Sequence, residues 1–231
     1  MELDAIAQQA VEIPTYLAET YWWAYVHPAA VRVFERQWLV NLILWGNFRK
    51  LREAALDALG GQLPGRTLQV ACVYGDLTPC LAARVAPGGS LDVVDVLPIQ
   101  LENLARKLPD GAPVNLVHGD SARLPAADAS YERVLAFFLL HEQPSDVRRA
   151  TLREAVRALK PGGRLVVVDY HRPHALHPLR PLLRPLLERL EPFALDLWKS
   201  DLDAWLPEGE RLRVRKRCLF GGLYQLMEVS K

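Results

Sequence analysis

Between residues 68 and 170 the sequence alternates apolar, β-branched runs with longer runs of mixed polarity. The apolar runs predicted as strands span 68–73, 90–96, 114–120, 131–140 and 164–170. The intervening runs predicted as helices span 76–85, 99–108 and 146–159, and the KPGG stretch at 160–163 is predicted as a turn. Apolar strands that alternate with amphipathic helices predict a parallel sheet with helices on both faces.

The two ends of the chain have a different character. Residues up to 59 are rich in aromatics and are predicted to be helical, and glycines and prolines interrupt the chain at 60–65. Runs at 211–220 and 223–230 flank Gly221–Gly222 and predict an antiparallel hairpin at the sheet edge. We therefore predict an α/β fold: a doubly wound, mostly parallel, seven-stranded sheet with an antiparallel C-terminal hairpin. One domain of residues 1–231 would comprise an N-terminal helical lid (1–60), a cofactor-binding core (61–171) and a basic segment with the hairpin (172–231).

Composition excludes several classes of function. The net charge of +1 gives no reason to invoke nucleic acid as a partner. The three cysteines show no C-x-x-C spacing, which argues against a disulfide scaffold or a zinc site and fits a reducing compartment. The acidic start MELDAIAQQAVE lacks an apolar segment, so no signal peptide is expected. No apolar run approaches the ~20 residues that span a bilayer. We expect a cytoplasmic protein associated peripherally with the inner membrane, or one on the mitochondrial matrix side in a eukaryote.

Three landmarks follow one another along the core. Asp95 ends the second predicted strand, "GDSARLPAADASYERVL" begins at Gly119, and "LKPGGRLVVVDYHRP" begins at Leu159. In this order they resemble the class I S-adenosylmethionine-dependent methyltransferases, with a Rossmann-like fold, over residues 68–173. The resemblance implies that Asp95 binds the ribose hydroxyls of the cofactor and that Asp120 accepts a hydrogen bond from its adenine amino group.

A closer resemblance covers nearly the whole chain. It is carried by "YWWAYVHPAAVRVFERQWLVNLILWGN", "LQVACVYGDLTP", "LDVVDVLPIQLENL", "FFLLHEQP" and "VVVDYHRPHALHPLRPLLRPLLERLEPFALDLW". These segments are similar to the rhodoquinone-biosynthesis enzymes of the RquA type, which serve anaerobic respiration. The resemblance implies conversion of ubiquinone to rhodoquinone, in which an amino group replaces a ring methoxy group. It also implies that S-adenosylmethionine donates the nitrogen and that manganese(II) assists.

The loop after the first strand, "TLQVACVYGDLT", departs from the usual cofactor loop. Ala71 and Val73 replace glycines that let a backbone approach a cofactor, and Gln69 replaces an acid. A carboxylate near an amine favours its charged form, so a neutral Gln69 leaves more of the free amine as a nucleophile. We hypothesise that Gln69 and the Val73–Tyr74 turn direct the methionine amine toward the quinone. The residues expected to bind the cofactor are Gln69, Ala71, Val73, Tyr74, Gly75, Asp95, Val96, Asp120, Ser121 and Phe138.

Polar residues also follow the fourth and fifth strands, where ligands of open α/β sheets gather. The residues expected to be catalytic are Tyr74, His141, Glu142 and Asp169. Manganese prefers carboxylate, carbonyl and water ligands and tolerates imidazole. The candidate metal ligands are His141 and Glu142, followed by Asp169, His171 and Asp76; spacing alone does not choose among them. The alternative role for the His141–Glu142 pair is a hydrogen bond at the start of a helix.

Two segments suit a lipophilic substrate. Aromatic residues near the N-terminus could supply the apolar surface that a quinone and its isoprenoid tail require: Tyr21, Trp22, Trp23, Tyr25 and Trp38. Arginines interleave with leucines and prolines at 172–189, which suits peripheral contact with an anionic inner membrane, while the prolines should break or kink any helix there. The alternatives are ordinary helix packing for the aromatics and a solvated face for the arginines.

Three functions remain in competition. The leading interpretation is an aminating quinone enzyme, and the second is a conventional C- or O-methyltransferase that acts on a quinone or its precursor. The segment "VVVDYHRP" is similar to the corresponding stretch of ubiquinone and menaquinone C-methyltransferases. The third is a cofactor-bound protein without catalytic activity that assists quinone synthesis. The departures in the loop favour the first interpretation over the second.

Overall fold

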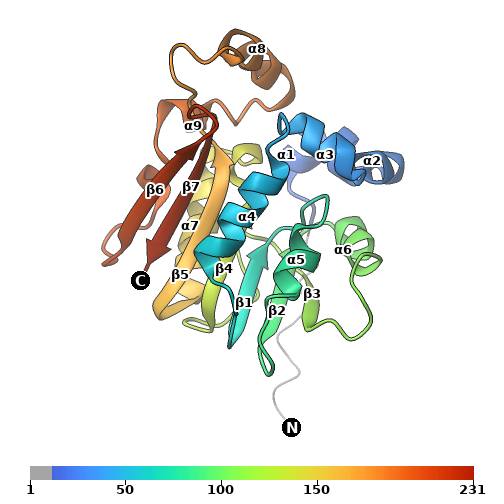
Figure 1. Ribbon diagram of the computed structural model, residues 1–231, viewed down its shortest axis with the longest axis vertical. Coiled ribbons are helices and arrows are strands. Elements are labelled where there is room, and N and C mark those ends of the chain that lie inside the picture. The colour runs from blue at the N-terminus through green and yellow to red at the C-terminus, as the bar shows by residue number, and fades with distance from the viewer. Residues whose placement is uncertain (1–11) are drawn as a thin grey trace.

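The computed structural model describes residues 12–231; residues 1–11, which carry the expectation about a signal peptide, lie outside the described part. Seven strands form one sheet in the order β3-β2-β1-β4-β5-β7-β6 (Figure 1). The strands are β1 (Arg66–Val70), β2 (Ser90–Asp95), β3 (Val114–His118), β4 (Tyr131–Phe137), β5 (Leu159–Tyr170), β6 (Arg213–Leu219) and β7 (Tyr224–Ser230). The first five strands pair in parallel, and β7 is antiparallel to both β5 and β6. The predicted fold class is confirmed.

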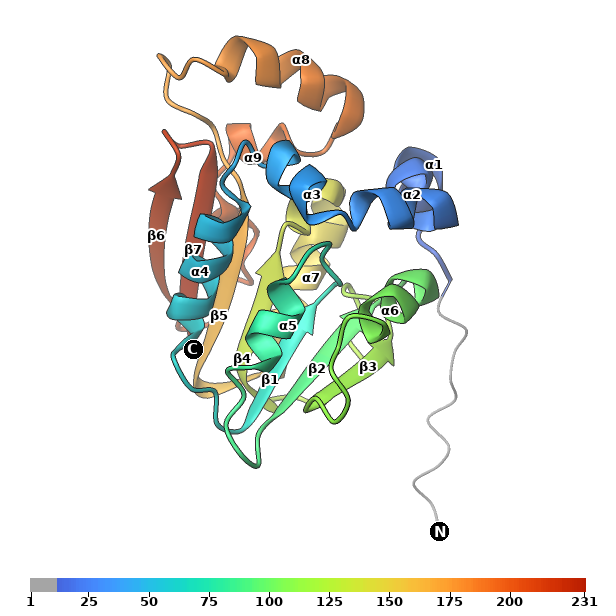
Figure 2. The same cartoon turned by 45° about the vertical axis from the view of Figure 1, so that its right-hand side comes forward.

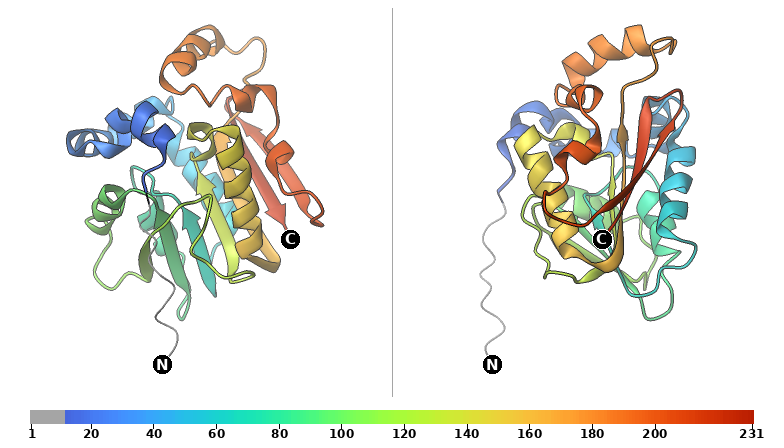
Figure 3. Two further views of the ribbon diagram at one scale, coloured as in Figure 1. Left: turned by 180° about the vertical axis from the view of Figure 1, so that it is seen from behind. Right: turned by 90° about the vertical axis from the view of Figure 1, so that its left-hand side faces the viewer.

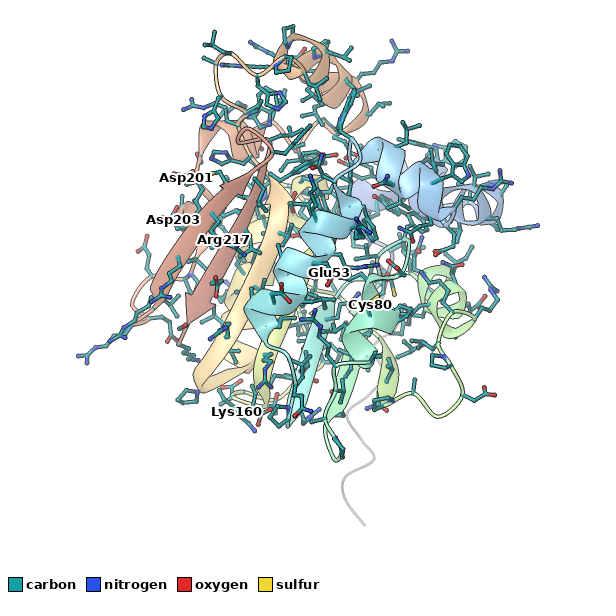
Figure 4. All side chains as sticks on the ribbon, viewed as in Figure 1. Glu53, Cys80, Lys160, Asp201, Asp203 and Arg217 are labelled. Atoms are coloured by element: carbon teal, nitrogen blue, oxygen red, sulfur yellow. The ribbon has the colours of Figure 1, made fainter. Side chains whose placement is uncertain are left out.

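Helices cover both faces of the sheet, which explains why its strands read as continuous apolar runs. The helices that follow or precede the core strands are α4 (Phe48–Leu59), α5 (Leu77–Ala82), α6 (Pro98–Ala105) and α7 (Ser145–Ala158). In Figure 1, α4 and α5 lie on the near face, and the rear view in Figure 3 shows α7 on the other. In Figure 4, Glu53 and Cys80 mark α4 and α5 on this near face. Between the two layers, Val134, Leu135, Val166 and Val167 are fully buried.

The remaining helices gather beyond the carboxyl ends of the parallel strands (Figure 2). They are α1 (Thr15–Thr20), the π-helical turn η1 (Trp22–Val26), α2 (Pro28–Phe34), α3 (Gln37–Ile43), α8 (Arg180–Leu190) and α9 (Asp196–Lys199). The 3-10 turn η3 (Leu202–Trp205) contacts α7. α8 stands farthest from the sheet, at the top of Figure 2. Within residues 12–231, every helix is too short or too polar to cross a bilayer.

Two local predictions were wrong. The KPGG stretch lies within the bounds of β5, where residues 160–163 form a bulge relative to β4 and the amide of Gly162, at a φ of +77°, donates to the carbonyl of Lys231 instead. The prolines after residue 180 do not prevent a helix. Pro181 occupies the first turn of α8, where an amide hydrogen has no partner, and Pro185 one turn later removes only one intrahelical bond.

Candidate active site

A cavity of about 600 Å³ lies at the carboxyl end of the sheet, beneath the N-terminal helices and α8. Its floor is formed by residues that follow β1, β2 and β4, including Asp95, His141 and Glu142. Its walls are mainly apolar and come from α1, η1, α2, α3 and α8. In an open α/β sheet this is the edge where ligands bind. The cavity therefore defines the candidate site.

Asp95 is held at the floor by backbone amides. Its Oδ2 accepts a hydrogen bond of 2.7 Å from the amide of Cys72, and its Oδ1 accepts one of 2.8 Å from the amide of Leu97. Burial raises the pKa of Asp95 to about 6, against the lowering effect of these two bonds. The carboxylate is thus fixed in one orientation and remains charged at neutral pH.

Side chains outside the cavity hold the loop after β1 in place by hydrogen bonds to its backbone. Lys107 Nζ donates to the carbonyls of Val73 and Gly75, at 3.3 and 2.9 Å, and Glu35 Oε1 accepts from the amide of Gly75 at 3.2 Å. Ala71 has a φ of +70°, a left-handed conformation that glycine adopts more easily. Ala71 and Val73 line the cavity, whereas Gly75 lies outside its lining. The loop keeps a turn typical of a cofactor loop without the usual glycines.

Tyr74 joins this loop to the lid. Its ring stacks between Tyr25 and Phe34, with centroids 5.8 and 6.0 Å away, and its hydroxyl donates to the carbonyl of Ala24 at 2.7 Å. Gln100 Nε2 donates to the same hydroxyl at 2.9 Å. Burial raises the pKa of Tyr74 above its ordinary value. Although Tyr74 lines the cavity, these contacts make it a positioning residue.

The side chain of Gln69 does not line the cavity. It is fully buried in β1, where its Nε2 donates to the carbonyl of Ala71 at 2.9 Å and its Oε1 accepts from Thr78 Oγ1 at 3.0 Å. Both polar ends of the amide are therefore used to hold the turn. The hypothesis that Gln69 and the Val73–Tyr74 turn direct the methionine amine toward the quinone stays a prediction; in this geometry the Gln69 amide could act on the cofactor only through the loop that it holds.

His141 and Asp169 form a buried pair next to the cavity. His141 Nδ1 lies 2.9 Å from Asp169 Oδ1, without a well-aligned hydrogen bond, and Asp169 Oδ2 accepts from the amides of Leu140 and His141. Burial lowers the pKa of His141, but the negative charges of Asp169, Glu191 and Glu142 outweigh this effect and raise it to about 9. His141 lines the cavity, and Asp169 lies behind it. Asp169 is thus placed to act through His141.

Glu142 shares the 3-10 turn η2 (Leu140–Glu142) with His141, and both side chains line the cavity. The distance from His141 Nε2 to Glu142 Oε1 is 3.7 Å, and the hydroxyl of Tyr25 donates to the same oxygen. Glu191 Oε2, directly after α8, lies 4.0 Å from His141 Nε2 and has no hydrogen-bond partner among residues 12–231. Burial raises the pKa of Glu142 to about 8, with a further contribution from Glu191 and an opposing one from His141. The cluster can hold and exchange protons.

Other predicted site residues divide into two groups. Val96, Ser121 and Phe138 line the cavity, and the ring of Phe138 packs edge-on against His141. Asp120 lies outside the lining, because its Oδ1 accepts from the amide of Ala122 in a turn.

Two candidate metal ligands lie apart from the cavity. Asp76 binds the guanidinium of Arg52, and His171 Nε2 lies 3.5 Å from Asp201, which Figure 4 marks beside the hairpin. Within residues 12–231, no group of three or more His, Cys, Asp or Glu side chains is placed to hold a metal ion. The described residues therefore do not fit the manganese that the resemblance implies.

Sequence analysis did not predict the site contacts of three residues. Gln100 tethers Tyr74 and the carbonyl of Tyr25, Tyr25 binds Glu142, and Glu191 approaches His141 from α8. The aromatic content near the N-terminus points to Tyr25 only as one member of a group. Nothing in the local sequence around Gln100 or Glu191 marks either residue.

Comparison with known proteins found sequence relatives over the core of the chain. Residues 67–163 match a family model described as a methyltransferase domain. A demethylmenaquinone methyltransferase of Staphylococcus aureus (strain JH9) is 32% identical over 135 residues, which is 58% of this chain and 55% of that protein. The chain thus spans about half the length of the curated relatives it matches.

Solved structures agree on the fold. A SAM-dependent methyltransferase from Aquifex aeolicus has a TM-score of 0.55 at 17% identity and covers 88% of this chain and 97% of its own. The mitomycin 7-O-methyltransferase MmcR has a TM-score of 0.63 at 23% identity and covers 88% of this chain and 58% of its own. At these identities the likeness shows the fold alone, which is that of the class I S-adenosylmethionine-dependent methyltransferases.

Proposed function

We propose that the chain is an S-adenosylmethionine-dependent transferase whose acceptor is a lipophilic quinone. The observation that carries this proposal is a single cavity in which the Asp95 carboxylate, the His141–Glu142 pair and a large apolar wall all meet. A cofactor with ribose hydroxyls and an apolar ring acceptor can occupy such a cavity together.

The residues on the floor fit S-adenosylmethionine. Asp95 is anchored by two amides and lines the cavity, so its remaining lone pairs can accept from ribose hydroxyls. Ala71 and Val73 present the loop backbone to the same space. When bound there, S-adenosylmethionine supplies either an activated methyl group or an α-amine.

The polar cluster fits a quinone. His141 carries a raised pKa and lines the cavity, so its Nε2 can donate to a quinone carbonyl and stabilise the negative charge that develops on its oxygen. Asp169 holds the imidazole from behind through its charge. The rings of Tyr25, Phe34 and Phe138 supply an apolar surface for the quinone ring.

We propose amino transfer to ubiquinone as the specific reaction, which would yield rhodoquinone. The amine nitrogen adds to the ring carbon that bears a methoxy group, and methoxide leaves and takes up the amine proton as methanol. A base then removes a proton from the β-carbon of the methionine moiety, the bond between the nitrogen and the α-carbon breaks, and the nitrogen takes up a proton. The ring keeps the amino group, and the cofactor leaves as its α,β-unsaturated product. This proposal is supported by the sequence resemblance and by the departures at Gln69, Ala71 and Val73 from an ordinary methyl-donor loop. Ubiquinone is thus the proposed partner, and peripheral contact with the membrane that holds it follows from its lipophilic tail.

Methyl transfer to a quinone or its precursor is the second candidate, and the comparisons favour it. The matched relative in Staphylococcus aureus is named a demethylmenaquinone methyltransferase. In this reaction the His141–Asp169 pair would take a proton from the acceptor, and the same apolar wall would bind its ring. The cavity geometry serves both reactions, so the identity of the transferred group must be measured.

Binding experiments test the shared part of the proposal. Calorimetric titration with S-adenosylhomocysteine, followed by a short-chain ubiquinone, should show that one protein binds both. Asp95→Asn should weaken S-adenosylhomocysteine roughly 10- to 100-fold through loss of charge-assisted bonds, while quinone affinity stays unchanged. Asp110→Asn on the exposed surface is the matched control and should bind like the wild type. Binding of neither ligand, or an unaffected Asp95→Asn variant, would refute the proposal.

A further inference from the structure

The mouth of the cavity is surrounded by exposed apolar side chains. Trp38 and Leu42 on α3 are 61% and 63% exposed, and Leu182 on α8 is 55% exposed. We call this set the cavity rim: Trp38, Leu42 and Ile43 from α3, and Leu182, Leu186 and Leu190 from α8. Both helices lie at the same end of the molecule, beyond the strands (Figure 2).

The cavity rim is continuous with the interior of the site. Leu42 and Ile43 of α3 and Leu186 and Leu190 of α8 are exposed, yet they also line the cavity that contains Asp95 and His141. An apolar chain can therefore pass between α3 and α8 while remaining in contact with apolar side chains.

α8 does not need its exposed leucines to stay folded on the protein. Its inner side buries Leu183 and Leu187, which are 2% and 3% exposed. The exposed leucines lie on the adjoining side of the helix, where they contribute apolar area to solvent. A helix with one broad apolar side that is only partly buried, and with a basic composition, suits the surface of a membrane.

The charge of the segment that contains α8 favours an anionic membrane. The segment 172–190 carries four arginines, Arg172, Arg180, Arg184 and Arg189, and one acid, Glu188. Glu188 pairs with Arg184 at 3.0 Å, from Oε1 to Nε, which leaves the segment with a net positive charge. Basic residues beside an apolar face are attracted to anionic headgroups.

We propose that the cavity rim docks on an anionic lipid bilayer and that the gap between α3 and α8 admits the isoprenoid tail of the acceptor. The route for the tail rests on the proposed function, whereas the docking surface does not. A bilayer is the occupant that the geometry favours, because a protein seated on the rim would close the mouth of the cavity. The bilayer instead presents a lipophilic acceptor directly to it.

Vesicle flotation tests the docking surface with the full chain. The wild type should float with phosphatidylcholine vesicles that contain phosphatidylglycerol, and much less with phosphatidylcholine alone. Leu182→Asp/Leu186→Asp should lower vesicle affinity at least about tenfold, and Arg184→Gln and Arg189→Gln about fivefold each. The matched controls are Val214→Asp and Arg217→Gln, both exposed on β6, beside which Figure 4 labels Arg217.

A milder substitution controls for misfolding of α8. Leu182→Ala, outside the cavity lining, removes apolar area without adding charge and should weaken flotation, with circular dichroism and S-adenosylhomocysteine affinity unchanged. No flotation of the wild type with anionic vesicles would overturn the proposal. Equal flotation of the rim and control variants would also overturn it. A wild type that does not float, forms a dimer and becomes a monomer on rim substitution would show that the rim binds a second copy of the chain instead.

Turnover separates the tail route from the proposed function. Leu182→Asp alters a rim residue outside the cavity lining, so it should keep turnover of a short-chain ubiquinone in detergent-free buffer and lose that of a long-chain ubiquinone embedded in vesicles. Equal loss on both substrates would overturn the tail route. If the wild type neither binds nor turns over either quinone, the proposed function is refuted. Flotation would still test the docking surface, because it does not depend on turnover.

Discussion

The amide of Cys72 donates a 2.7 Å hydrogen bond to Oδ2 of Asp95, which ties the loop after β1 to the acid at the end of β2. Burial raises the pKa of this acid to about 6, above the ordinary aspartate value of about 3.9. Ribose hydroxyls donate to the charged carboxylate, so cofactor binding should require its ionised form.

Cofactor affinity should therefore fall in mild acid. As pH decreases from about 7 to about 5, the Kd for S-adenosylhomocysteine should rise about tenfold, with a midpoint near the pKa of Asp95. Acid unfolding through Asp95 is not the cause. A folded-state pKa above the unfolded value makes the unliganded fold less stable as pH rises between about 4 and about 6, not as it falls. Calorimetry across this range should show a flat, weak profile for Asp95→Asn; a parallel decline in that variant would contradict the assignment.

Replacement of His141 should affect chemistry more than binding. His141→Gln removes the group that can donate to, or take a proton from, the acceptor, so turnover should fall roughly 10²- to 10⁴-fold. S-adenosylhomocysteine should bind with nearly unchanged affinity, because Asp95 is untouched. His171→Gln is the matched control, since His171 lies beside the hairpin and outside the cavity lining, and it should keep full turnover. Equal losses in the two variants would remove His141 from the site.

Gln69→Glu should act through the loop. A buried carboxylate there cannot donate to the carbonyl of Ala71 and would face that oxygen instead, which we expect to cost about 1–3 kcal/mol of unfolding free energy. Thermal unfolding should show a lower Tm, together with weaker cofactor binding. Gln62→Glu, at an exposed position, is the control. A variant with wild-type Tm and cofactor affinity but suppressed turnover would instead favour the direct amine effect predicted from sequence.

The hydroxyl of Tyr25 fastens the lid to the catalytic cluster through Glu142. Tyr25→Phe leaves one oxygen of a buried carboxyl without this donor, so the unfolding free energy should drop by about 1–3 kcal/mol. For a chain of this size that corresponds to roughly 2–4 °C in Tm for each kcal/mol. The KM for the quinone should rise as the lid loosens. Trp22→Phe, on the exposed side of the same segment, should leave both the Tm and the KM unchanged.

The sequence predicted the sheet well because helices bury both of its faces, which leaves a strong apolar signal in each strand. It also placed Asp95, His141 and Glu142 at strand ends, where the parallel topology brings them together.

The sequence could not place Glu191, which lies 4.0 Å from His141 only because α8 folds back over the sheet. The hydrogen-bond partners of the Gln69 amide could not be predicted either, because the turn between Gln69 and Thr78 brings these two side chains together. The first turn of α8 shows why a proline-rich run can still be helical.

The central claim is that the chain transfers the amino group of S-adenosylmethionine to ubiquinone. We would incubate the protein with a short-chain ubiquinone and S-adenosylmethionine labelled with nitrogen-15 on the amine and carbon-13 on the methyl group, with and without manganese(II). Mass spectrometry should find a quinone that has gained nitrogen-15 and lost one methoxy group. A quinone that carries carbon-13 would contradict amino transfer and establish methyl transfer, and the absence of label from every quinone would contradict both.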